Sequence, residues 1–317
     1  MTSILKRALA HVPLLRHMTS DESSPGGGGD PRADLVEVLR LIEKQLGVIA
    51  STIDDINTAN IIRIMDFELK RDPRYSDPRR LLGSAAQVCS QNGEDGMIGE
   101  IFRRIGTRDC IFAEVGVEDG HENNTAFLLA QGWSGFWFDG DDRFASTLQS
   151  RTDLGGGRIK GLVAFLTREN IGDAFSKVGV PEEFDLLSLD VDQNTYYLWE
   201  GLSRFRPRVV VVEYNASIPP DIDWKVRYDP TGIWDRTNNF GASLKAYELM
   251  GSRLGYCLVG CDFTGVNAFF VRSDLAGDLF ASPFTAANHY EPPRYQLTHR
   301  RGHKRRILDL AEATNSG

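Results

Sequence analysis

Short apolar runs separated by segments with helical spacing constrain the fold of this 317-residue chain more than any other feature. Continuous apolar runs are typical of strands buried on both faces, and their alternation with helices indicates a parallel sheet covered on both sides. The expected strands are residues 111–116, 135–141, 159–165, 184–192 and 208–215, followed by a closing pair, 256–261 and 267–272. A helix that starts within 90–95 and runs to 105 is expected before the first strand, and the helices expected between the later strands are 123–131, 167–178, 195–205 and 242–254. The pattern predicts a Rossmann-like α/β fold: a mostly parallel, doubly wound sheet with an antiparallel C-terminal strand.

The segments that flank this sheet differ from it in composition. Residues 1–32 are expected to be a leader that ends in a flexible Gly- and Ser-rich linker. Residues 33–80 carry apolar positions at three- and four-residue spacing, which predicts a long helix or helix pair that packs on the main domain or joins two copies in a homodimer. The heptads are too few to assign a coiled coil from the sequence. The main domain is expected to span 81–280 and a basic tail 281–317.

Composition excludes several classes of protein. The formal net charge is -8 and the pI is near 5.4, so nucleic-acid binding is not expected. The basic cluster at 299–306 is interpreted as a solvated tail, with an anionic partner as the alternative. No apolar run is long enough to predict a transmembrane segment, and charges and Pro13 interrupt residues 4–15 too often for a signal peptide. Four cysteines without a second metal-binding pair favour reduced thiols and a cytoplasmic location.

Acidic residues stand at the ends of four expected strands. In open α/β sheets, ligands bind at the carboxyl ends of the strands, so these carboxylates are expected at one edge. Carboxylates that are close together need cations or hydrogen-bond donors, so the edge is expected to bind hydroxyls, an ammonium group or a metal. The strand-end segments are Glu114–Gly120, Asp139–Asp142, Asp190–Asp192 and Glu213–Asn215.

The first of these segments contains a glycine turn. Gly116 and Gly120 permit a tight turn, and Asp139 follows at the end of the next strand, where a carboxylate suits a ribose diol. A tight strand–helix turn with a surface acid is the structural alternative.

These residues carry a resemblance to a known family. The order of glycine turn and acidic strand ends resembles class I S-adenosyl-L-methionine (SAM)-dependent methyltransferases. The details are similar to FkbM-type methyltransferases of sugar and polysaccharide gene clusters, over roughly residues 85–275. The segments that carry it are 90–95 (SQNGED), 112–120 (FAEVGVEDG), Gly132-Trp133, 185–192 (DLLSLDVD) and 207–215 (PRVVVVEYN).

The resemblance implies a site for SAM. Glu114, Gly116 and Gly120 would line its methionine part, Asp139 would hold the ribose, and Asp141 or Asp142 would support that loop. Asp190 would face the amino group or the methyl-transfer centre.

Methyl transfer to a hydroxyl also needs alignment and a base that removes the proton. The candidates are Asp192, Glu213 and His121, the last of which follows the glycine turn directly and is a capping or surface residue in the alternative interpretation. Asp190, Asp192 and Glu213 are also candidate ligands of a divalent cation such as Mg²⁺, which would acidify the acceptor hydroxyl. A helix cap is the structural alternative for Asp192.

A long irregular segment, 214–240, follows the fifth strand and is interpreted as a lid or substrate loop. Its aromatic residues are expected to stack on sugar faces and its amides to bind hydroxyls; the candidates are Asn215, Trp224, Tyr228, Trp234 and Asn239. A structural loop packed by its own aromatics is the alternative. The expected activity is O-methylation of a sugar, glycan or glycosylated small molecule. The alternatives are a non-catalytic binding or scaffold protein, indicated by Glu118 in the glycine turn, and a metal-dependent nucleotide-sugar transferase.

Overall fold

The computed structural model describes residues 31–68, 71–118, 120, 122–145 and 157–295. The chain divides into two units, one that ends at Ile56 and one that begins at Asn57. Within the described residues, no helix is long and apolar enough to cross a membrane. The basic cluster at 299–306 and His121 lie outside the described residues.

The first unit consists, where it is described, of one long helix. This helix, α3 (Pro31–Ile62), continues into the second unit and is followed by a π-helical turn, η1 (Arg63–Glu68). It begins at Pro31, whose fixed φ is compatible with the first helical turn, and no proline follows before Pro73. The predicted N-terminal helix is therefore confirmed.

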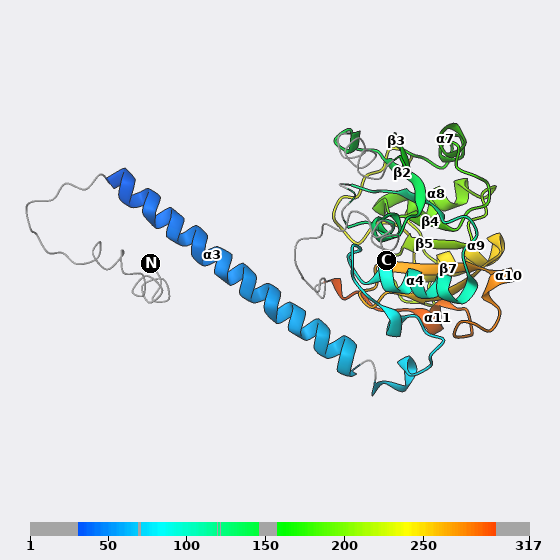
Figure 1. Cartoon of the computed structure of the whole chain (residues 1–317), viewed down its shortest axis with the longest axis horizontal. Coiled ribbons are helices and arrows are strands. Elements are labelled where there is room, and N and C mark those ends of the chain that lie inside the picture. Colours follow the sequence, from blue (N-terminus) through cyan, green and yellow to red (C-terminus); the bar gives the residue numbers. More distant parts are fainter. Residues whose placement is uncertain (1–30, 69–70, 119, 121, 146–156, 296–317) are drawn as a thin grey trace, which may run out of the picture. The chain divides into compact units, whose positions relative to one another are not determined.

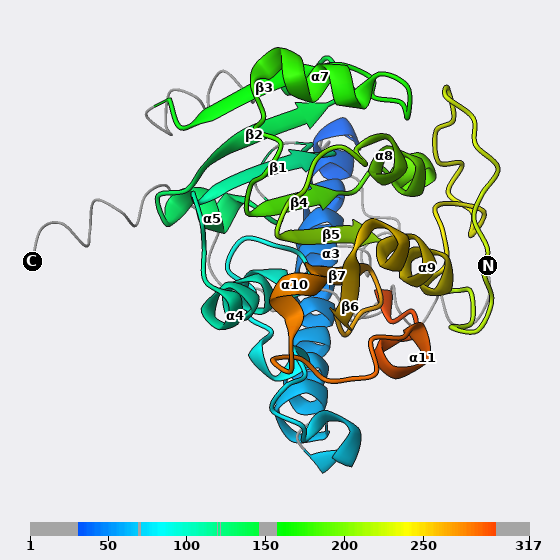
Figure 2. The ribbon, with the colours of Figure 1, turned by 90° about the vertical axis from the view of Figure 1, so that its right-hand side faces the viewer.

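A seven-stranded sheet forms the centre of the second unit. Its order is β3-β2-β1-β4-β5-β7-β6, and Figure 2 shows the arrowheads of β1, β2, β4 and β5 pointing to the same edge. The first five strands are parallel, and β7 pairs antiparallel with both β5 and β6. The predicted fold class is confirmed. The strands are β1 (Ile111–Val115), β2 (Ser134–Asp139), β3 (Ile159–Val163), β4 (Leu186–Leu189), β5 (Val209–Glu213), β6 (Tyr256–Cys261) and β7 (Asn267–Arg272).

Helices cover both faces of the sheet, and each face has its own hydrophobic core (Figure 1). Side chains alternate along a strand, so Phe112 and Val211 face one core while Ala113 and Val212 face the other. The first core includes α4 (Glu94–Ile105), α5 (Ala126–Ala130) and α10 (Ser273–Ala276). The second includes α7 (Ile171–Val178), α8 (Thr195–Gly201), α9 (Leu244–Leu254) and α11 (Ala286–His289).

Helices α5 and α7 begin later than predicted because local side chains bind the backbone that precedes them. Asn124 and Thr125 donate their backbone N–H groups to the Glu114 carboxylate, so α5 begins only at Ala126. Thr167 exchanges side-chain hydrogen bonds with Asn170, and α7 begins at Ile171. The short one-turn helices of the unit are η3 (Pro73–Tyr75), η4 (Leu82–Ser84) and η5 (Asp192–Asn194).

The order of the strands determines where a ligand can bind. The chain runs outward from β1 through β2 to β3 and then returns to β4 on the other side of β1. At such a reversal the connections leave β1 and β4 in opposite directions, which opens a crevice at their carboxyl ends. Gly116, Asp139 and Asp190, three of the predicted site residues, lie at or directly after these strand ends.

Candidate functional site

The turn after β1 requires glycine at its first position. Gly116 has a φ of 85°, and a Cβ atom at this position would lie 1.7 Å from the carbonyl oxygen of Asp190. The ends of β1 and β4 therefore approach each other too closely for any side chain at Gly116. Gly120 (φ 67°) donates its N–H to Val117 and closes the turn. Glu118 has a φ of 50°, a left-handed conformation that is uncommon for a residue with a side chain.

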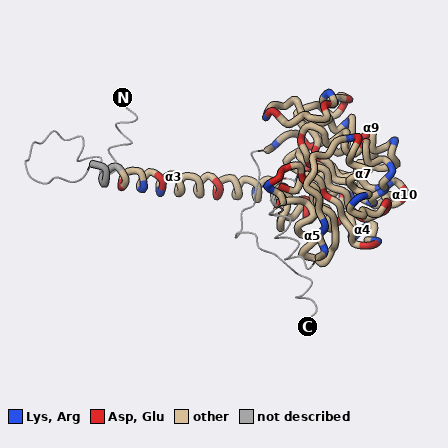
Figure 3. The backbone as a smooth tube through the Cα atoms, turned by 90° about the horizontal axis from the view of Figure 1, so that it is seen from above, with Lys and Arg blue, Asp and Glu red and all other residues tan. Residues whose placement is uncertain are grey.

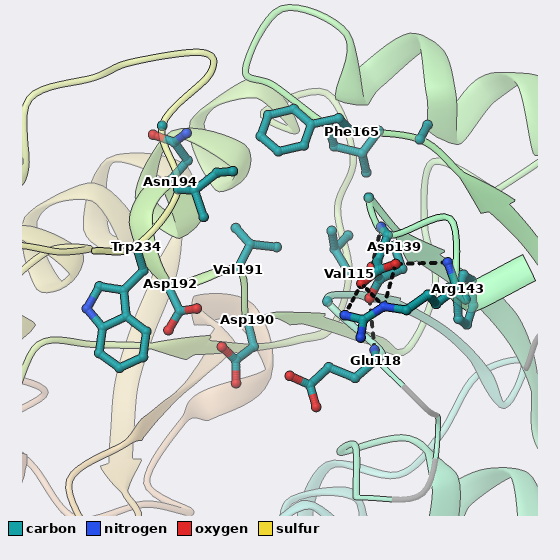
Figure 4. A pocket seen from close by; sticks show the side chains of 18 residues that line it. Val115, Glu118, Asp139, Arg143, Phe165, Asp190, Val191, Asp192, Asn194 and Trp234 are labelled. Atoms are coloured by element: carbon teal, nitrogen blue, oxygen red, sulfur yellow. Dashed lines mark hydrogen bonds and ion pairs between the residues drawn. The ribbon is translucent and has the colours of Figure 1, made fainter. Parts of the chain in front are cut away.

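Asp139 holds this turn in place. Its Oδ2 accepts hydrogen bonds from the backbone N–H groups of Val117 (3.0 Å) and Glu118 (2.8 Å), and its Oδ1 accepts from Asp141 N–H (2.8 Å). Figure 4 shows these interactions around Asp139, with Arg143 beside them. The carboxylate thus couples the turns after β1 and β2, and its Oδ1, which accepts one hydrogen bond, keeps a further lone pair for a ligand.

Asp141 is bound to its own loop. The Arg143 side chain and backbone N–H donate to the Asp141 carboxylate, and these hydrogen bonds lower the pKa of Asp141 to about 2. Arg143 is paired with Asp141, and it also interacts electrostatically with Glu118 and Asp139.

Two adjoining cavities open at the carboxyl ends of the strands. The larger, about 790 Å³, extends over the ends of β1, β2, β3 and β4, and the smaller, about 290 Å³, lies between β1, β4, β5 and the start of α4. A volume of 790 Å³ falls within the range of small-molecule and cofactor sites. The residues common to both linings are Gly116, Glu118, Asp190, Asp192 and Trp234.

Three carboxylates meet at the wall between the cavities. One oxygen from each of Asp190, Asp192 and Glu213 lies within 4.8 Å of the others. Burial and repulsion from Asp192 and Glu114 raise the pKa of Asp190 to about 7, while a hydrogen bond with Glu213 opposes the shift. Burial and the charges of Asp190 and Asp192 raise the pKa of Glu213 well above its usual range. Burial and the charge of Glu118 also raise the pKa of Asp192, which has a φ of 53°.

Few positive charges balance these acids. Arg143 is the one basic side chain among the described residues of the larger lining, which also contains Glu118, Asp139, Asp141, Asp190 and Asp192. The described lining of the smaller cavity contains seven acids and no lysine, arginine or histidine. In Figure 4, Glu118, Asp190 and Asp192 project into a shared space beside Trp234. The arrangement is suited to a ligand with positive charge or many hydrogen-bond donors.

Glu114 lines the smaller cavity, but its hydrogen bonds are internal to the protein. It is 2% exposed and accepts from Asn123 Nδ2 (2.6 Å), Asn124 N–H (2.9 Å), Thr125 N–H (3.1 Å) and Thr125 Oγ1 (2.5 Å). Burial raises its pKa despite these donors. Glu114 therefore fixes the start of α5 to β1 and adds to the negative potential at Asp190.

Asn194 is a site residue that the sequence analysis missed. It is 4% exposed, lines the larger cavity, and donates from Nδ2 to the carbonyl of Asp229 (2.8 Å). Its Oδ1 is buried and has no hydrogen-bond partner among the described residues. Only the fold brings Asn194 to the cavity, and its sequence neighbourhood contains no signal beyond the Asp190–Asp192 segment.

The predicted substrate residues of the loop at 214–240 have different environments. Trp234 is 39% exposed and lines both cavities. Asn215 is fully buried, and its Nδ2 donates to the carbonyls of Asn238 (2.8 Å) and Phe240 (2.9 Å). Asn215 holds the loop together and lines neither of these two cavities.

The other three loop residues also lie outside the cavity linings. Trp224 packs against the hydrophobic core. Tyr228 packs on Tyr197 and donates its hydroxyl to Glu169. Asn239 is exposed, and its backbone N–H donates to Thr237. Of the five predicted substrate residues, the structure brings only Trp234 to the acidic cluster.

No model of a protein family matches the sequence, and a comparison with curated proteins finds no match either. Solved structures with a similar arrangement include a SAM-dependent methyltransferase from Aquifex aeolicus (11% identity, TM-score 0.33, 55% of this chain and 89% of that one). Another is a methyltransferase from Clostridium acetobutylicum (10% identity, TM-score 0.36, 55% and 88%). A third is the N-terminal domain of EvdMO1, solved with S-adenosylhomocysteine (SAH) and D-fucose (13% identity, TM-score 0.38, 56% and 80%). Such distant likeness assigns no ligand or reaction, and the chemistry has to be derived from the residues of this chain.

Proposed function

We propose that this chain is a SAM-dependent O-methyltransferase whose acceptor is a sugar, a glycan or a glycosylated small molecule, with the methyltransferase domain at residues 81–280. The observation that carries the proposal is the excess of carboxylates at the switch point of a Rossmann-like sheet. Dinucleotides and nucleotide sugars bring phosphate groups, which these carboxylates would repel. SAM instead carries a sulfonium and an ammonium group, which the same carboxylates attract.

The larger cavity fits such a cofactor. Gly116 has no side chain that would cover the backbone of the turn after β1. Asp139 presents a carboxylate that three backbone N–H groups already hold in place. We assign the ribose hydroxyls to Asp139 and the positively charged groups to Asp190, with Glu114 and Gly120 supporting the turn from behind. When bound, SAM supplies an activated methyl group.

The protein's own contribution to the reaction is alignment and proton removal. Asp190 lies on the wall between the cavities, so it can contact both a cofactor in the larger one and an acceptor hydroxyl. A carboxylate whose pKa is raised to about 7 is a stronger base than an ordinary aspartate and is still ionised above neutral pH. Glu213 shares a hydrogen bond with Asp190, and burial together with the charges of Asp190 and Asp192 raises its pKa, so we assign the shared proton to Glu213. Trp234 offers an aromatic face for a sugar ring.

A divalent cation is a second way to use the same acids. Asp190, Asp192 and Glu213 supply three oxygen ligands within 4.8 Å of one another, a donor set that Mg²⁺ prefers. A cation at this position would acidify the acceptor hydroxyl and relieve the repulsion among the three carboxylates. Because such a cation would offset the negative charge of the carboxylates, it would also allow the phosphates of a nucleotide sugar to bind at this site.

The proposal is tested by methyl transfer from SAM to a panel of free and glycosidic sugars, with and without a chelator. We expect transfer to at least one sugar-containing acceptor, and a loss of at least about 100-fold in Asp190→Asn, the usual size of a general-base contribution. Asp173→Asn, on an exposed position of α7, is the matched control. Transfer that survives the chelator excludes the cation. Full activity of Asp190→Asn would remove Asp190 as the base.

A further inference from the structure

Helix α3 carries an exposed apolar stripe in strict alternation of three- and four-residue steps. The six residues are Leu39, Ile42, Leu46, Ile49, Ile53 and Ile56, each between 48% and 60% exposed. This alternation places them at the a and d positions of three consecutive heptads, with Leu39, Leu46 and Ile53 at a. From Leu39 to Ile56 the stripe is about 26 Å long at 1.5 Å per residue. An apolar surface of this length is the mark of an interaction site.

The residues that flank the stripe are compatible with a coiled coil between identical copies. In a parallel pair, each g residue faces the e residue five positions later in the partner helix, and charges there select partners. The facing residues here are Val38 with Glu43, Gln45 with Ala50, and Thr52 with Asn57. Glu43 is the one charged residue among them, so none of these pairs brings like charges together across a parallel interface.

A membrane surface is a poorer match for the same stripe. Helices that lie on anionic membranes carry many lysines and arginines on their polar face. Along α3 there are three basic residues (Arg32, Arg40, Lys44) and five acidic ones (Asp34, Glu37, Glu43, Asp54, Asp55), a balance of -2. Figure 3 shows that charged residues are also sparse along the coloured part of the helix.

We propose that α3 joins three or four copies of this chain in a parallel coiled coil. The identity of the a and d residues determines the number of strands. β-Branched residues at a with leucine at d favour two strands, whereas leucine or isoleucine at a with isoleucine at d favours three or four. Ile42, Ile49 and Ile56 place isoleucine at every d position of the stripe. The heptads therefore specify an assembly larger than a dimer, independently of the reaction that the second unit catalyses.

The oligomeric state of the full chain tests this proposal. Sedimentation equilibrium or light scattering after size exclusion should give three or four times the 35.3 kDa of one chain. A mass of one or two chains would overturn it. So would a single chain in solution that co-sediments with vesicles containing phosphatidylserine.

Two variants test whether the apolar stripe of α3 determines the mass of the assembly. Ile49→Asp places a charge at a central d position and should reduce the mass to one chain, whereas Ser51→Asp, on the opposite face, should leave it unchanged.

An exchange variant keeps leucine or isoleucine at every position of the stripe, with three of each instead of two leucines and four isoleucines, so it remains informative even if Ile49→Asp fails to fold. It combines Leu39→Ile, Ile42→Leu, Leu46→Ile, Ile49→Leu and Ile56→Leu, which places isoleucine at every a and leucine at every d. It should have twice the mass of one chain. An unchanged mass in this variant would show that packing at a and d does not determine the assembly.

Discussion

Gly116→Ala should destabilise the protein much more than alanine at another glycine with the same backbone conformation. Gly116 has a φ of 85° and Gly179 a φ of 87°, so alanine at either position costs about 1–2 kcal/mol for the left-handed backbone. At Gly179, the C-cap of α7, a Cβ atom would meet nothing within 4 Å. At Gly116 it would lie 1.7 Å from the carbonyl oxygen of Asp190, whereas real Cβ atoms do not come closer than about 3.0 Å. The ends of β1 and β4 would therefore have to separate by more than 1 Å.

That separation breaks the hydrogen bond from Asp190 N–H to the carbonyl of Val115, now 3.0 Å long. A buried backbone pair left unsatisfied costs about 1–3 kcal/mol, so Gly116→Ala should lose about 4 kcal/mol in total against about 1–2 kcal/mol for Gly179→Ala. Urea unfolding followed by circular dichroism gives the free energy of unfolding of both variants. If the two lose the same amount within about 0.5 kcal/mol, the close approach of β1 and β4 is not what requires glycine at position 116.

Three further predictions concern the acids and the loop. The pKa of Asp190 is raised in the folded protein to about 7, so the folded protein holds a proton on this group that the unfolded chain has already released. The stability that this proton provides is complete below about pH 4 and is lost as the pH rises through 7. Asp190→Asn should therefore flatten the fall in unfolding free energy between pH 5 and 8, and an unchanged slope would assign the fall to other groups. Asn215→Ala removes hydrogen bonds to the carbonyls of Asn238 and Phe240 and should cost about 2 kcal/mol in urea unfolding, whereas Asn239→Ala, on an exposed position of the same loop, should cost less than about 0.5 kcal/mol. Trp234→Ala should raise the KM for the sugar acceptor about tenfold. The melting temperature should change little, because the Trp234 side chain is 39% exposed. An unchanged KM would place the acceptor elsewhere.

Much of the fold could be predicted from the sequence because the period of the apolar residues is a local property. The runs at 111–116 and 208–215 became β1 and β5, and Gly265 lies in the connection between β6 and β7. The ends of helices were less predictable because they depend on individual hydrogen bonds. Glu114 binds three successive residues before α5, and nothing in the local pattern distinguishes that from an earlier helix start.

The site was predictable to the extent that it follows from topology. Carboxyl ends of parallel strands must share an edge, so Asp139, Asp190 and Glu213 could be placed near one another from their positions after apolar runs. The loop at 214–240 could not be resolved in this way, because its irregular backbone carries no period. Asn215 and Trp234 are both candidate substrate residues of this loop in the sequence, yet Asn215 is fully buried and Trp234 lines both cavities.

Calorimetric titration of the full chain with SAH tests the central claim most directly, because it asks whether the acidic cleft binds this cofactor class. We predict one site per chain, at least tenfold weaker binding in Asp139→Ala, and unchanged binding in the exposed control Asp173→Ala. NAD and UDP-sugars without a divalent cation should not bind, because the carboxylates repel their phosphates. A folded sample that binds NAD or a UDP-sugar under these conditions but not SAH would contradict the account.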